Sequence, residues 1–241
     1  KKLGLCIAFS LVVCYNLNIY SLKGMIKMRL TINDLIDEAA AFSEWFSTLN
    51  HVELIGVTDG KAVGTYVEHA FQNYLNERYE MSIGSSALGI DLPSVNTDIK
   101  TTSIVQPQSS CPFKSARQKI FGLGYNLLVF VYHKEDTANE CHLAMTHCTF
   151  IEADRTADYT LTRLIRQSLE IGANKEDIIA LLTDKNVPGD EITYNDLADE
   201  IFNNPPEQGY LTISNALQWR LQYKRVISLD NQIQGVVNFV W

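Results

Sequence analysis

The sequence predicts an α/β protein with a central β-sheet flanked by helices and a mainly helical C-terminal part. Two amphipathic helix patterns lie near the start of the chain. A continuous apolar run at 126–132 is typical of a strand buried on both faces, and three further helix patterns follow between residues 156 and 202. Helices and strands in this order favour a sheet core followed by a helical region.

The composition is typical of a globular protein, and the charged residues are distributed unevenly along the chain. The 241 residues are 46% hydrophobic and 20% charged, which excludes disordered and fibrous classes. The net charge is −8, and residues 170–207, with ten acids and two lysines, carry a charge of that size by themselves. Residues 99–134 and 208–229 contain basic residues but no acid. A basic, nucleic-acid-binding face is therefore compatible with an acidic protein.

The cysteines and the first residues bear on localisation. The five cysteines lack the spacing of a disulfide framework, which favours a reducing, cytoplasmic compartment. Residues 1–24 begin with two lysines and an apolar stretch, as a signal peptide does, but that stretch is short for a membrane span. Because Met25 and Met28 precede a helix start, we expect residues 1–24 to be a non-native upstream segment; a signal peptide and secretion are the alternative.

Two helices are expected before the first strand. Thr31 can cap the first one, whose apolar residues recur at helical spacing as far as Phe46. Asp59 can cap the second, at 62–79, whose buried face includes Val67. Glu68 follows Val67 at the edge of that face, where a carboxylate can reach an active site.

The middle of the chain predicts strands around a polar loop. A turn leads into a strand at 98–105, and the loop 106–112 contains two prolines that end regular structure. A short basic helix is expected at 113–121, followed by strands at 126–132 and 142–151.

The C-terminal part predicts mostly helices. The patterns indicate helices at 156–171, at 174–182 with Asn174 as its cap, and at 193–202. A last basic helix is expected at 214–224, and residues 226–229 could add a strand.

The main chemical signal is formed by Asp91, Asp98 and Lys100. Side chains alternate along a strand, so Asp98 and Lys100 project together while Ile99 points into the core. Two acids beside an ammonium group suit a hard cation and leave a charged group for chemistry. An Asp-x-Lys triplet alone is usually a solvated strand face, but the spacing to Asp91 and the helix bearing Glu68 favour a catalytic role.

These residues resemble a known pattern. Asp91, six intervening residues and Asp98-Ile99-Lys100 resemble the motif of the PD-(D/E)xK nuclease superfamily. Lys61-Ala62-Val63-Gly64 with Glu68, and the later segment 115–120, are similar to type II restriction endonucleases and the mismatch-repair nicking endonuclease. The resemblance covers residues 61–132. It departs from the pattern at Asp98, where Glu is commoner, and at Ile90, where Pro is usual.

The resemblance implies a restriction-endonuclease-like core with a central mixed sheet at 25–155, and a helical region at 156–241 packed on it. It also implies Mg²⁺-dependent hydrolysis of double-stranded DNA. Asp91, Asp98 and the carbonyl of Ile99 would hold Mg²⁺. Lys100 would orient or help deprotonate the attacking water, and Glu68 would assist a second metal or orient Lys100.

A type II restriction enzyme is the preferred interpretation, and cleavage of both strands of a palindrome implies a homodimer. A nicking repair endonuclease and a non-catalytic DNA-binding protein of the same fold are the alternatives. The DNA-binding candidates are basic or amide side chains near the motif: Lys61, Lys114, Arg117, Lys119, Gln106 and Gln108.

A zinc site at 141–148 is not favoured. Strand alternation would place Cys141 and His147 on one face and His142 and Cys148 on the other, so the four ligands would not converge.

Overall fold

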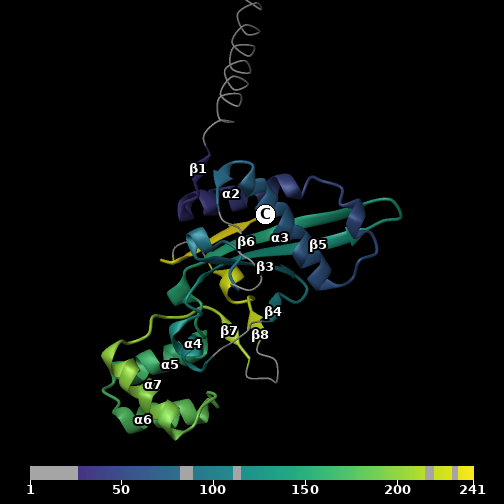
Figure 1. Ribbon diagram of the computed structural model, residues 1–241. Coiled ribbons are helices and arrows are strands. Elements are labelled where there is room, and N and C mark those ends of the chain that lie inside the picture. The colour runs from purple at the N-terminus through teal and green to yellow at the C-terminus, as the bar shows by residue number, and fades with distance from the viewer. Residues whose placement is uncertain (1–26, 82–88, 111–114, 215–219, 230–232) are drawn as a thin grey trace, which may run out of the picture.

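A four-stranded mixed sheet forms the centre of the computed structural model, which describes residues 27–81, 89–110, 115–214, 220–229 and 233–241. The strand order is β3-β5-β6-β9 (Figure 1). β3 runs parallel to β5, whereas β5–β6 and β6–β9 are antiparallel. β3 and β9 are the two edges of the sheet. The bounds are β3 (Thr97–Ser103), β5 (Asn126–Asp136), β6 (Cys141–Ile151) and β9 (Val236–Val240).

One face of this sheet is covered by α2 (Ile32–Phe46) and α3 (Gly60–Asn76), as Figure 1 shows. Thr31 and Asp59 cap these helices with their side chains, as predicted. Phe42 and Phe71 pack against Phe130 of β5, with ring centroids 5.7 and 5.0 Å away. α3 ends before the predicted Tyr79, because Tyr79–Glu80 forms β2 and pairs with β1 (Met28–Arg29).

The other face of the central sheet packs on a small three-stranded sheet of order β4-β8-β7 and on η4 (Val226–Ser228). Its strands are β4 (Gln108–Ser110), β8 (Arg220–Gln222) and β7 (Thr212–Ile213). The predicted helix at 214–224 is wrong in its described part. Leu221 and Tyr223 are buried while Arg220 and Gln222 are not, so an alternation of period two prevails over the helical pattern.

Two further expectations about the C-terminus need correction. The segment 226–229 begins with a 3₁₀ helix instead of forming a strand. The strand β9, which no pattern suggested, completes the central sheet by pairing with β6. The proposed division of the chain at residue 155 stays a prediction, but the region beyond it supplies three strands as well as helices.

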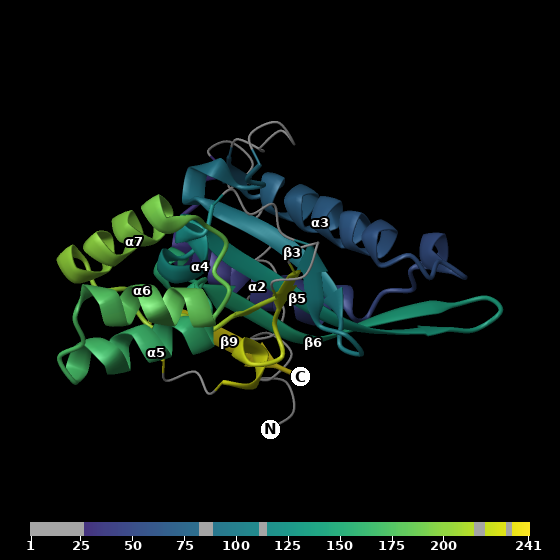
Figure 2. The ribbon, with the colours of Figure 1, turned by 90° about the horizontal axis from the view of Figure 1, so that it is seen from below.

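Three helices beyond residue 156 form a group with α4 (Arg117–Phe121) around a separate apolar core, as Figure 2 shows. They are α5 (Tyr159–Glu170), α6 (Lys175–Asp184) and α7 (Glu191–Asn203). Asp158, Asn174 and Asp190 cap them, and Asn174 also forms a capping box with Asp177. The expected helices are confirmed, with bounds shifted by a few residues.

Short 3₁₀ turns complete the described elements: η1 (Val52–Leu54), η2 (Pro93–Val95) and η3 (Ala153–Arg155). Among the described residues, no helix has the length and apolar character needed to cross a membrane. Residues 1–24 lie outside the described part, so the expectation about them is not tested.

A bulge in β6 changes the faces predicted for its cysteines. The register shifts so that His147 pairs with Val131 and Met145 with Tyr132, which leaves Thr146 unpaired. Cys141 and Cys148 therefore face the same core, contrary to the prediction. Both are free and buried.

Candidate active site

Asp98 and Lys100 lie on β3, at the edge of the central sheet, and share one face of it. The register pairs Asp98 with Leu127 and Lys100 with Val129, and these two apolar residues belong to the core under the small sheet. Ile99 packs into the opposite core, with α2 and α3. The predicted alternation is confirmed.

Asp91 reaches the same strand through a tight loop. Leu92 and Thr97 form an antiparallel bridge with two backbone hydrogen bonds, of 2.9 and 3.2 Å. Between them η2 ends at Asn96, whose φ of 47° turns the chain back. Asp91 Oδ2 then accepts a 2.7 Å hydrogen bond from the backbone N–H of Ile99. The six-residue gap is the length of this loop.

Glu68 approaches from the other side of β3. It lies on α3, which packs on the helical face of the sheet, and it is half-buried. Burial raises the pKa of Glu68 to about 7; the Asp91 carboxylate adds to this increase, and Lys100 opposes it. Glu68 thus comes from the helix layer and approaches Asp91 and Asp98 at the edge of β3.

Burial and neighbouring acids of the site raise the pKa values of Glu68 and Asp98. Asp98 is only 5% exposed, and this burial raises its pKa to about 7, with Lys100 opposing and Asp91 contributing to the rise. Lys100 Nζ lies 2.6 Å from Asp98 Oδ2. Three acids therefore lie near one ammonium group, and a bound cation would favour the ionised forms of Glu68 and Asp98.

The donor set fits Mg²⁺. No three His, Cys, Asp or Glu side chains in the described ranges already converge as a metal cage. Mg²⁺, however, usually takes one or two carboxylates and completes its shell with water and phosphate. The N–H of Ile99 engages one oxygen of Asp91, and Lys100 engages one oxygen of Asp98. Asp91 also interacts with the side chains of Glu68 and Asp98, so a metal would bind where the carboxylates come together. The C=O of Ile99 points to the same side of the strand as its N–H.

The predicted DNA-binding residues in the described part of the chain lie on several different elements. Lys61 is exposed at the start of α3, and Gln106 is exposed after β3. Arg117 pairs with Glu200 of α7, with 2.6 Å between Nη2 and Oε1. Lys119 is buried, and desolvation lowers its pKa while Asp158 opposes this. Lys114 lies outside the described residues.

Gln108 belongs to β4, and Thr102 connects it to the catalytic strand. The Thr102 side chain lies on the same face of β3 as Lys100, and its Oγ1 accepts a 3.0 Å hydrogen bond from the backbone N–H of Gln108. Thr102 was not among the predicted site residues. Its position two residues after Lys100, on the same face of the strand, could have identified it. Gln222 was also missed, since it was assigned to a helix.

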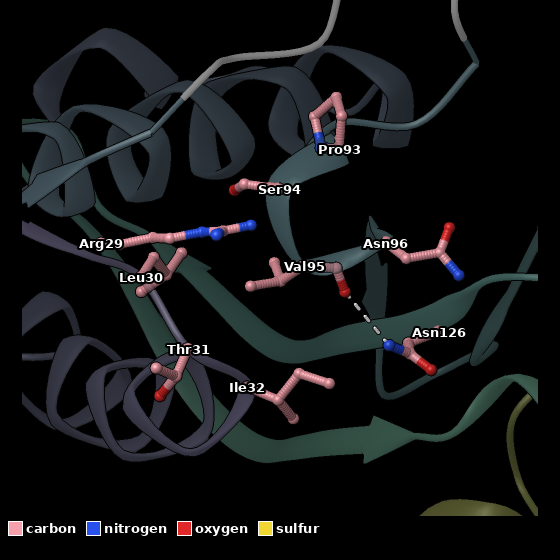
Figure 3. A pocket seen from close by; sticks show the side chains of 9 residues that line it. All are labelled: Arg29, Leu30, Thr31, Ile32, Pro93, Ser94, Val95, Asn96 and Asn126. Carbon is pink, nitrogen blue, oxygen red and sulfur yellow. Dashed lines mark hydrogen bonds between the residues drawn. The ribbon is translucent and has the colours of Figure 1, made fainter.

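A separate cavity of about 570 Å³ lies between the start of α2 and η2 (Figure 3). Arg29, Ser94 and Asn96 line it, and Asn126 Nδ2 donates to the carbonyl of Val95 at its base, at 3.2 Å. None of the catalytic candidates lines this cavity.

Comparison with known proteins places most of the chain in one group. Residues 29–238 match the family model described as "Type II restriction enzyme NspV". The chain is 57% identical over 210 residues to the type II restriction enzyme NspV of Nostoc sp. (strain ATCC 29411 / PCC 7524). The aligned region covers 86% of this chain and 96% of that relative. No solved structure gives a significant match.

Proposed function

The chain belongs to the NspV family of type II restriction enzymes and is a DNA endonuclease, and we propose that it cleaves double-stranded DNA with Mg²⁺ held by Asp91 and Asp98. The observation that carries this proposal is the convergence of both acids and Lys100 at the free edge of β3. An edge strand leaves room for a duplex, whereas a buried strand would not.

Each residue has a distinct role in the proposed mechanism. Asp91, Asp98 and the carbonyl of Ile99 would hold Mg²⁺. When bound, Mg²⁺ supplies Lewis acidity and neutralises phosphate charge. Lys100 orients the attacking water and offsets the charge that develops on the pentavalent phosphorus. Glu68 adjusts the position of Lys100 or contributes to a second metal site.

The approach of DNA would begin with its phosphates. Lys61 is an exposed cation at the start of the helix that bears Glu68, which suits it for a phosphate contact. Arg117 and Lys119 are less suited, because the first is paired with Glu200 and the second is buried. Two copies of the chain would act together, since a palindromic site cut on both strands needs two catalytic centres. The reducing cytoplasm suits the free thiols of Cys141 and Cys148.

The catalytic assignment is tested with Asp98→Ala. We expect no cleavage of phage DNA in Mg²⁺, with DNA binding in Ca²⁺ retained. Asp196→Ala is the matched control, because Asp196 is an exposed acid on α7 far along the chain from β3. Full cleavage by Asp98→Ala would refute the assignment. Supercoiled plasmid as substrate separates the alternatives: a restriction enzyme gives linear product, and a nicking repair enzyme stops at the open circle.

A further inference from the structure

The small sheet has one buried face and one polar face. Leu221 and Ile213 are buried against the central sheet. On the opposite face, the register places Gln108 opposite Gln222, and Gln222 opposite Thr212. Within the described part of the chain, neither glutamine side chain makes a hydrogen bond. Figure 1 shows the three strands side by side below β3. A row of unengaged amide and hydroxyl groups thus crosses this outer face.

An exposed arginine lies at the end of the row. Ser110 and Arg220 form the next cross-strand pair on the same face, and both are exposed. The two sequence segments that supply β4, β8 and β7, residues 99–134 and 208–229, contain no acid. Arg220 therefore suits this end of the face for contact with a phosphate, unlike the acidic helices at 170–207.

The outer face of the small sheet lies close to β3, the strand that carries Lys100. Thr102 lies two residues beyond Lys100, about 6.6 Å along the strand, and its hydroxyl holds the backbone of Gln108. Gln108 therefore lies within about 10 Å of Lys100, which equals roughly three base-pair steps of duplex DNA. A group at that distance can contact bases beside the bond being cut.

We propose that the outer face of the β4-β8-β7 sheet reads base edges in the major groove of the substrate, through Gln108, Gln222 and Thr212. The inference deepens the proposed function, because it relies on catalysis at Lys100. Strands of a small β-sheet can contact the major groove, and a carboxamide pairs bidentately with N6 and N7 of adenine, while a threonine methyl contacts the thymine methyl. A·T pairs are thus the expected targets, and Arg220 suits a neighbouring guanine or phosphate.

The test compares specificity in two variants, Gln108→Ala and Gln222→Ala. The cleavage site is first mapped by sequencing the ends of phage DNA digested by the unmodified protein. Duplexes with that site and with each single A·T→G·C replacement are then compared by kcat/KM in Mg²⁺ and by binding in Ca²⁺. For each variant, kcat/KM on the mapped site is divided by kcat/KM on the duplex with the relevant A·T→G·C replacement. This ratio should fall by about 10- to 100-fold relative to the unmodified protein. Gln167→Ala, an exposed glutamine on α5, should leave all ratios unchanged.

Two results would overturn the inference. One is an unchanged ratio in both variants. The other is an equal loss of cleavage on all duplexes, with binding specificity in Ca²⁺ intact, because that would indicate a catalytic or structural role. Failure of the catalytic assignment is distinguishable: Asp98→Ala would then still cleave, whereas the specificity ratios of the glutamine variants are measured independently of it.

Discussion

Asp91 accepts a 2.7 Å hydrogen bond from the backbone N–H of Ile99, so the first acid of the site is anchored to the strand that carries the second. The same bond orients the Asp91 carboxylate, which also interacts with Glu68 and Asp98. It therefore links the geometry of the loop at 91–97 directly to the proposed chemistry.

Two substitutions of Asp91 separate these contributions. Asp91→Asn retains an oxygen that can accept from Ile99, whereas Asp91→Ala does not. Both should lose cleavage in Mg²⁺. Only the alanine variant should also lose about 1–2 kcal/mol of unfolding free energy in metal-free buffer, because a hydrogen bond to a charged group is removed. Cleavage assays and urea unfolding measure the two effects. Equal stability of the two variants would show that the anchor contributes little.

Glu68 is expected to support the site without being essential. Glu68→Gln removes one of three crowded carboxylates but leaves Asp91 and Asp98 for the metal. We predict a fall in cleavage rate of about 10- to 100-fold, smaller than the loss in Asp98→Ala, and a higher Mg²⁺ concentration at half-maximal rate. Glu77→Gln, at the exposed end of α3, is the control. A complete loss in Glu68→Gln would place Glu68 among the essential ligands.

Asp98→Asn should stabilise the protein when no metal is present. The carboxylate is buried beside Asp91, and its ion pair with Lys100 does not fully compensate for the burial. In EDTA at pH 8, the variant should gain about 1–2 kcal/mol of unfolding free energy. Adding Mg²⁺ should stabilise the unmodified protein more than the variant. A lower stability of Asp98→Asn in EDTA would contradict this account of the site.

His51 should make the fold acid-sensitive. Its Nε2 lies 3.0 Å from the carbonyl oxygen of Phe46, which can only accept, so Nε2 carries the proton, while Nδ1 lies 3.3 Å from the Tyr66 hydroxyl. Burial lowers the pKa of His51 below 6.5. The unfolded chain therefore takes up the proton first, and stability falls as pH drops below 6.5, by up to about 1.4 kcal/mol per unit.

The measurement is urea unfolding at pH 7 and pH 5. His51→Gln can still donate to Phe46 but does not titrate, so the loss of stability between the two pH values should shrink. His69→Gln, an exposed position on α3, should leave it unchanged. The same pH dependence in His51→Gln as in the unmodified protein would assign it to other groups.

Local patterns were sufficient for much of the fold and for the shared face of Asp98 and Lys100. The capping side chains of Thr31, Asp59 and Asn174 predicted three helix starts, because a cap is formed within a few residues of sequence. Strand alternation likewise predicted that Asp98 and Lys100 share a face. These signals depend on short-range geometry, which a single sequence contains.

Long-range pairing decided the rest. The segment at 220–222 carries a weak pattern that suits either a helix or a strand, and it becomes β8 because β4, more than a hundred residues earlier, offers a partner. Gln222 joins the outer face of the small sheet only through that pairing.

The site itself shows the same division. The sequence by itself determined the spacing of Asp91, Asp98 and Lys100 and the helix that bears Glu68. Only the tertiary structure decided that Glu68 comes close to Asp91 and Asp98, since Glu68 belongs to the helix layer on one face of the sheet and Asp98 projects from β3 toward the opposite face. Packing of the helix layer on the sheet, which local sequence does not encode, brings the charges together.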